Sequence, residues 1–230
     1  MRVSNTRKEG VHIVEIEYKW GLQAAEGSRK ALDAAELIAP YVRGVQGISM
    51  HAVYYDTADG LTGQLGVGLR IRRENERSVC CLKVPVNEGD CAVRHEYEVE
   101  AADIYEGLAA LQQAGAPADL CEQLASANLI AACETQFERR AFALEMPAGA
   151  VELPAGADGA APAASESFAA ELAFDEGVLR REGREQPLRE MELEHKGGSL
   201  AAFHAFAAQL EATLGLAREP LSKHARAMRL

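Results

Sequence analysis

The chain has 230 residues, and its 24 Lys and Arg against 35 Asp and Glu give a formal net charge of −11. This acidic balance argues against a nucleic-acid partner. The composition, 48% hydrophobic and 26% charged, is that of a globular protein with a sizeable core, which excludes disorder as the main state. The polar start MRVSNTRKEG is no signal peptide and no apolar run is long enough to cross a bilayer, so we expect a cytoplasmic protein without membrane contact.

Alternation of apolar and polar residues with a period of two predicts a series of strands. They are expected over residues 11–20, 47–57, 67–73, 79–84, 92–100, 134–144, 168–175 and 188–196. Helical patterns cover residues 27–42, 103–114, 118–132 and 199–214, and a last short helix starts at Ser222, whose hydroxyl can cap the first turn. The predicted class is α+β with a large, mostly antiparallel sheet.

One stretch breaks this regular pattern. Residues 147–167, PAGAVELPAGADGAAPAASES, are rich in Ala, Gly and Pro and carry no period. We expect a flexible hairpin insertion inside a single domain spanning residues 1–230, because the strands on either side share one chemical pattern. An interdomain linker is the alternative. The five cysteines are odd in number and lack a C-x-x-C pair, so they predict neither a disulfide framework nor a zinc site.

Charged residues recur on one face of nearly every predicted strand. In the first strand, Glu15, Glu17 and Lys19 share a face. The corresponding sets in later strands are Arg70 and Arg72; Lys83; Arg94, Glu96, Glu98 and Glu100; Arg139 or Arg140; Glu171 and Asp175; and Glu190, Glu192, Glu194 and Lys196. A single strand of this kind usually turns its charged face to water. The recurrence also fits a sheet closed into a barrel with the charges inside.

These charged side chains indicate a particular chemistry if they meet. Two residues of a Glu-x-Glu pair lie about 7 Å apart on a strand, and clustered carboxylates repel unless a cation bridges them. Hard oxygen ligands select Mg²⁺ or Mn²⁺. Arginine forks and lysine point charges suit a multiply charged phosphate ligand. The residues alone therefore suggest a site for a metal and a polyphosphate.

Several motifs resemble those of the CYTH superfamily, the triphosphate tunnel metalloenzymes. The first is EIEYK at residues 15–19, which resembles the E-x-E-x-K signature of that family. The others follow in order along nearly the whole chain: YYDT, LRIR, LK, RHEYEVE, TQFERR, LAFDEG, EMELEHKGG and LSKHAR. The likeness is greatest to bacterial inorganic triphosphatases, particularly those with an appended helical CHAD domain. This sequence ends at Leu230, so we expect either a stand-alone CYTH protein or a shortened form.

The resemblance implies a closed antiparallel barrel of eight strands, with helices packed outside and a tunnel that binds a triphosphate. By position it implies metal ligands at Glu15, Glu17, Asp175, Glu190, Glu192 and Glu194. It implies phosphate contacts from Lys19, Arg70, Arg72, Lys83, Arg139 and Lys223, with Arg94, Glu96 and Glu98 lining the same lumen. Arg139 is preferred to Arg140 because it holds the family's place after Phe137. Glu15, Glu17, Lys19, Arg70 and Arg72 are the predicted catalytic group.

The implied reaction is metal-dependent hydrolysis of inorganic tripolyphosphate to pyrophosphate and phosphate, with Mg²⁺ or Mn²⁺ as cofactor. Class IV adenylate cyclase and thiamine triphosphatase activities use the same tunnel and stay open as alternatives. So does a non-catalytic polyphosphate-binding module, although such a module would do better without so many carboxylates. We expect a small-molecule polyphosphate as the partner, and a monomer or homodimer.

Overall fold

The computed structural model describes residues 10–22, 24–86, 92–151 and 166–230. Its strands are β1 (Val11–Gly21), β2 (Val42–Asp56), β3 (Gly68–Glu74), β4 (Arg77–Val86), β5 (Ala92–Glu100), β6 (Ile130–Met146), β7 (Phe168–Arg181) and β8 (Arg184–Gly198). Its helices are α1 (Ala24–Ile38), a 3₁₀ turn (Ala39–Tyr41), α2 (Leu61–Leu65), α3 (Ile104–Gln113), α4 (Ala118–Ala125), α5 (Leu200–Leu214) and α6 (Lys223–Ala227).

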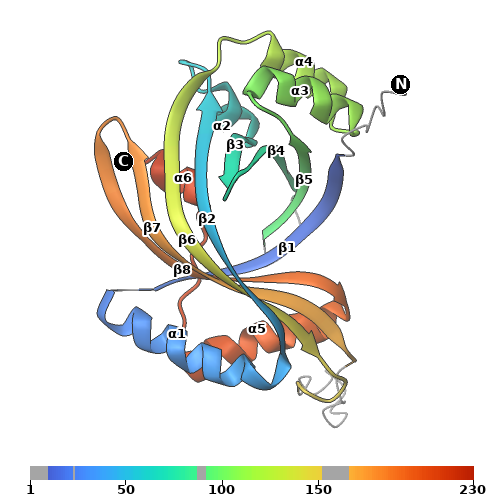
Figure 1. Cartoon of the computed structure of the whole chain (residues 1–230), viewed down its shortest axis with the longest axis vertical. Coiled ribbons are helices and arrows are strands. Elements are labelled where there is room, and N and C mark those ends of the chain that lie inside the picture. The colour runs from blue at the N-terminus through green and yellow to red at the C-terminus, as the bar shows by residue number, and fades with distance from the viewer. Residues whose placement is uncertain (1–9, 23, 87–91, 152–165) are drawn as a thin grey trace, which may run out of the picture.

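The strands close into an antiparallel barrel in the order β1-β5-β4-β3-β2-β6-β7-β8, with β8 returning to β1 (Figure 1). The predicted fold class is confirmed. Closure satisfies the backbone groups that an open sheet would leave at its edges. Because side chains alternate along each strand, closure also sends every second residue into the lumen.

Apolar side chains on the outer faces of the strands form the core with the helices. At one end α1 and α5 pack on β1, β7 and β8, where Trp20, Leu172 and Leu193 are buried against Phe203 (Figure 1). At the other end α3 and α4 cover β4 and β5. Burial of this apolar surface is the main stabilising contribution to the fold.

The short α6 packs differently from the other helices. Its Ala227 is buried among side chains of β2, β6, β7 and β8, including Met50, Phe137 and Leu188. The predicted cap is confirmed, because the Ser222 hydroxyl accepts a hydrogen bond from the Ala225 amide. This helix therefore closes part of the lumen and brings its own side chains to it.

Two predicted helix ends were wrong. The helix expected over 118–132 stops at Ala125, and residues 130–132 open β6 by pairing with β2. The run Ile130-Ala131-Ala132 fits the period of a helix as well as that of a strand, so its pairing with β2 decides that it is a strand. The helix expected over 27–42 ends at Ile38, and a 3₁₀ turn with Pro40 leads into β2, which starts before the predicted residue 47.

The last hairpin is longer than predicted. β7 continues past Asp175 to Arg181, and β8 begins at Arg184. Glu182 (φ 50°) and Gly183 (φ 76°) form the two-residue tip in left-handed conformation, which matches the twist of the flanking strands. The hairpin tip thereby lies near the C-terminal residues, since the Arg181 guanidinium donates to the Met228 carbonyl.

The predicted insertion at 147–167 connects β6 to β7, which pair directly, with Met146 opposite Phe168. Residues 152–165 lie outside the described residues, so flexibility of the insertion stays a prediction, as does the single domain. Val151 is buried in the core with α1 and α5. The described cysteines, Cys80, Cys81, Cys121 and Cys133, are buried and free of disulfides.

Candidate active site

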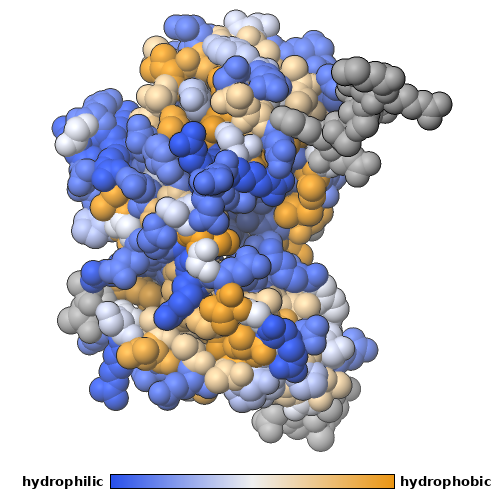
Figure 2. All heavy atoms as spheres, viewed as in Figure 1, coloured by the Kyte–Doolittle hydropathy of each residue, from blue (hydrophilic) through white to orange (hydrophobic). Residues whose placement is uncertain are grey.

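A cavity of about 330 Å³ occupies the barrel lumen. Figure 2 shows hydrophilic residues around the hollow in the middle of the face turned to the viewer. As many Lys and Arg as carboxylate side chains line it among the described residues, from strands far apart in the chain. Predicted site residues in this lining are Glu15, Glu17, Lys19, Arg70, Arg72, Lys83, Arg94, Glu96, Glu98, Arg139, Glu192, Glu194 and Lys223.

The remaining two predicted residues lie beneath the cavity floor. Asp175 and Glu190 face each other across β7 and β8, and their side chains have no exposed surface. Lys223 of α6 covers both carboxylates and itself lines the cavity. All predicted site residues are thus brought to one lumen, while their individual roles stay predictions.

The register of the strands explains why acids and bases meet in pairs. Glu15 lies opposite Arg94, Lys83 opposite Glu96, and Lys19 opposite Glu192. Opposite side chains in antiparallel strands have Cβ atoms roughly 5 Å apart, close enough for ion pairs. The arrangement of charges is therefore a consequence of strand pairing and not of loop conformation.

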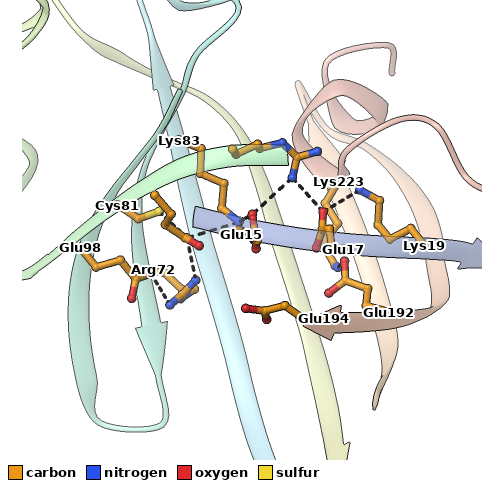
Figure 3. A network of polar contacts seen from close by, with 12 residues as sticks. Glu15, Glu17, Lys19, Arg72, Cys81, Lys83, Glu98, Glu192, Glu194 and Lys223 are labelled. Atoms are coloured by element: carbon orange, nitrogen blue, oxygen red, sulfur yellow. Dashed lines mark hydrogen bonds and ion pairs between the residues drawn. The ribbon is translucent and has the colours of Figure 1, made fainter. Parts of the chain in front are cut away.

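Two groups of contacts can be distinguished within the lumen. In the first, Lys83 Nζ donates to both oxygens of Glu15 at 2.7 Å, and Arg94 Nη1 contacts Glu17 Oε1 at 2.8 Å (Figure 3). Glu17 also accepts from Lys19 at 3.3 Å. This group, formed by β1, β4 and β5, holds the two glutamates of the E-x-E-x-K motif between three cations.

The second group is formed by β6, β7, β8 and α6. One oxygen of each of Asp175, Glu190 and Glu192 lies within 4.8 Å of the others. Arg139 grips Asp175 with two hydrogen bonds of 2.8 and 2.7 Å and also contacts Glu192. Lys223 Nζ contacts all three carboxylates.

Burial and the neighbouring cations shift the pKa values of the carboxyl groups in opposite directions. Desolvation raises the pKa of Glu15 to about 7, an effect that Lys83 only partly offsets, and it raises the pKa of Glu190 to about 6 despite Lys223. The pKa of Glu192 instead falls well below its usual value, because Lys223, Arg139 and Lys19 outweigh its burial. Carboxylates held ionised beside carboxyls with raised pKa values are typical of functional sites.

The donor set of the second group fits a hard divalent cation. All three residues offer carboxylate oxygens, the ligands that Mg²⁺ and Mn²⁺ take in proteins, and no softer atom is among them. A further group, Cys81 with Glu96 and Glu98, fits less well because it includes a thiol. Glu96 is also engaged by Arg70 and Lys83, at 3.4 and 3.3 Å, and its pKa is lowered by those cations against its burial.

Several residues in or beside the cavity had not been assigned a role from the sequence. Arg226 contacts Glu190, the Cys81 thiol donates to Glu96 at 2.9 Å, and Tyr54 accepts a hydrogen bond from Arg70 at 3.1 Å. The His224 ring stacks on Tyr54 with 4.7 Å between centroids. The period of two could have found Cys81, which shares parity with Lys83, but no pattern signals that α6 enters the lumen.

Comparison with known proteins identifies the fold family. The sequence profile of the CYTH domain matches residues 14–228. The chain belongs to the CYTH family. A search of curated proteins found no match. None of the described helices is both long and apolar enough to span a membrane.

Solved structures share the CYTH barrel. HpAC1 from Hippeastrum, described as an adenylyl cyclase candidate with a dominant triphosphatase activity, has a TM-score of 0.56 and 16% identity over 94% of this chain and 95% of its own. PH1819 from Pyrococcus horikoshii has a TM-score of 0.52 and 16% identity over 94% of this chain and 98% of its own. At such identities the likeness shows the CYTH fold alone.

Proposed function

We propose that this protein is an inorganic triphosphatase that hydrolyses tripolyphosphate to pyrophosphate and phosphate with Mg²⁺ or Mn²⁺. The observation that carries the proposal is the lumen itself, where arginines and lysines from seven elements surround two groups of buried carboxylates. A pure polyanion receptor would gain nothing from those carboxylates. HpAC1, with its dominant triphosphatase activity, supports the same assignment by analogy of fold.

Charge balance supports a metal-dependent reaction. Since basic and acidic side chains line the cavity in equal number, a polyphosphate brings negative charge that the walls alone do not neutralise. Asp175, Glu190 and Glu192 would hold a divalent ion, with Glu15, Glu17 and Glu194 on the neighbouring wall as further ligands. Such an ion, when bound, neutralises charge on the phosphates and lowers the pKa of water.

The basic side chains of this chain would position the substrate. Arg70 and Arg72 alternate along β3 and both face the lumen, so their guanidinium groups can contact successive phosphates. Arg139 of β6 and Lys19 of β1 line the same cavity. Donors fixed in place before the reaction stabilise the charge that develops on the departing pyrophosphate.

Size and wall chemistry favour an inorganic substrate over an organic triphosphate. The cavity of about 330 Å³ is at the lower end of the range of roughly 300–1,000 Å³ for small-molecule sites. The aromatic side chains in its lining, Tyr54 and Phe137, are already engaged, since His224 stacks on Tyr54 while Lys223 and Arg139 lie over the Phe137 ring. Stacking of a nucleobase or thiazole would have to displace these contacts.

A phosphate-release assay tests the proposal. The purified protein is given tripolyphosphate, ATP or thiamine triphosphate, with Mg²⁺, Mn²⁺ or EDTA. We expect release from tripolyphosphate with either metal, none in EDTA, and much slower release from the organic substrates. Faster turnover of ATP to a cyclic product would indicate a cyclase. Tight binding of tripolyphosphate without turnover under any condition would indicate a binding module.

A further inference from the structure

The ammonium group of Lys223 lies at the centre of the second carboxylate group. Its Nζ is 2.8 Å from Asp175 Oδ2 and 2.8 Å from Glu192 Oε1, and it also contacts Glu190 Oε1. Lys223 is drawn beside Glu192 in Figure 3. The side chain is only 8% exposed, and neither Asp175 nor Glu190 reaches solvent. Three converging carboxylates with a buried cation between them have the arrangement of a coordination site.

A divalent ion and this ammonium group would need the same position. Mg²⁺ binds carboxylate oxygens at about 2.1 Å and Mn²⁺ takes the same ligand class, so an ion held by all three carboxylates would lie where Lys223 Nζ now lies. A lysine is suited to leave such a position, since it is a compact charge on a flexible stem without a fixed donor geometry.

We propose that Lys223 is a resident counter-ion of the Asp175, Glu190 and Glu192 carboxylates, which a divalent metal must displace to bind there. The inference rests on the proposed function, which assigns these carboxylates to the metal. Lys223 is thereby a residue that controls metal affinity. It also makes metal loading and the docking of α6 competing events.

Displacement would loosen α6 at its first turn. Glu190 also accepts from Arg226, so a metal on this carboxylate weakens a second anchor of the helix. Contacts away from these carboxylates remain, among them the stack of His224 on Tyr54, the buried Ala227 and the bond from Arg181 to the Met228 carbonyl. Since α6 lines the cavity, a shift of its first turn would enlarge the lumen when metal enters.

Metal affinity without any phosphate ligand tests the displacement. Mn²⁺ binding is measured by electron paramagnetic resonance for the wild type, Lys223→Met and Lys30→Met. Lys30 lies on α1 outside the cavity and donates to the Gly215 carbonyl at 2.7 Å, so its variant removes one lysine charge without freeing any predicted metal ligand. We expect at least roughly tenfold tighter binding by Lys223→Met and little change for Lys30→Met. Adding Asp175→Asn to Lys223→Met should abolish the gain. Equal or weaker binding by Lys223→Met, or no binding by either protein, overturns the proposal.

Hydrogen exchange of the wild type provides a test that needs no variant. Saturating Mn²⁺ should speed exchange of the α6 amides while those of β7 and β8 stay protected. Unchanged or slower exchange in α6 at saturation overturns the proposal. Both measurements omit tripolyphosphate, so a protein that binds Mn²⁺ as expected but releases no phosphate would disprove the proposed function and leave this inference standing.

Discussion

The inner and outer faces of the barrel strands have different roles, and the adjacent residues Arg139 and Arg140 show the difference. Arg139 points into the lumen and grips Asp175 and Glu192, whereas Arg140 lies outside over the rings of Phe142 and Phe174. The outer face is largely apolar under the helices and stabilises the fold. The inner face buries charges at a cost visible in the raised pKa values of Glu15 and Glu190. Charge kept inside at that cost indicates function.

The strongest test of this comparison uses the two neighbouring arginines. Arg139→Gln should lower tripolyphosphate hydrolysis by about 10²–10³-fold, because it removes a fixed cation from the lumen. Arg140→Gln, as the matched control, should stay within about twofold, since it loses only a cation–π contact on the outer face. Steady-state phosphate release measures both. Comparable losses in the two variants would contradict the division between faces.

The outer face should instead control stability. Leu193 has no exposed surface and packs in the core beside Phe203, so Leu193→Ala should lower the free energy of unfolding by about 2–5 kcal/mol. Leu200, the first residue of α5, is 39% exposed, and its alanine variant should change stability by less than about 1 kcal/mol. Denaturant unfolding measures the difference. A small effect at Leu193 would show that the helices contribute less to stability than their packing indicates.

The buried carboxyls predict how the stability of the metal-free protein changes with pH. The folded-state pKa values of Glu15 (about 7) and Glu190 (about 6) lie above the ordinary value of 4.5. Their contribution is therefore present at low pH and is lost as pH rises through 6 to 7. In EDTA, the melting temperature should rise by about 5 °C from pH 8 to pH 5.5.

Further acidification should reverse this gain, because Glu17 and Glu192 have lowered pKa values whose stabilisation is lost as they protonate. Mg²⁺ should flatten the change between pH 8 and pH 5.5, since the metal competes with protons for the same carboxylates. A melting temperature that falls steadily from pH 8 to pH 5.5 in EDTA would show that ion pairing outweighs desolvation at Glu15 and Glu190.

Strand periodicity predicted the strands and the charged face that they share, because both depend on alternation. In the Glu-x-Glu-x-Lys run of β1 the three charged side chains must lie on the same face of the strand, and the two arginines of the Arg-x-Arg run of β3 must do the same. Family motifs added the closure of the sheet, which alternation alone left open. The ends of the helices and the lengths of β2, β7 and β8 were less predictable. Residues such as 130–132 fit the period of a helix and that of a strand, and pairing with the partner strand decides between them.

The contacts that α6 makes could not be predicted from the sequence. Five residues of helix carry no period long enough to indicate a buried face, and the sequence does not show that Lys223 reaches three carboxylates contributed by β7 and β8. The same holds for the stack of His224 on Tyr54. Such contacts depend on where the chain lies after the barrel has closed.

Replacing one carboxylate on each face of the barrel wall tests whether the charges inside the barrel carry out catalysis. Glu17 lies in the lumen between Arg94 and Lys19, whereas Glu138 is exposed on the outer face of β6. Phosphate release from tripolyphosphate with Mn²⁺ is compared for the wild type, Glu17→Gln and Glu138→Gln, with circular dichroism to show that all three are folded. We expect no detectable turnover by Glu17→Gln and wild-type turnover by Glu138→Gln. Near-normal hydrolysis by a folded Glu17→Gln protein would contradict this expectation.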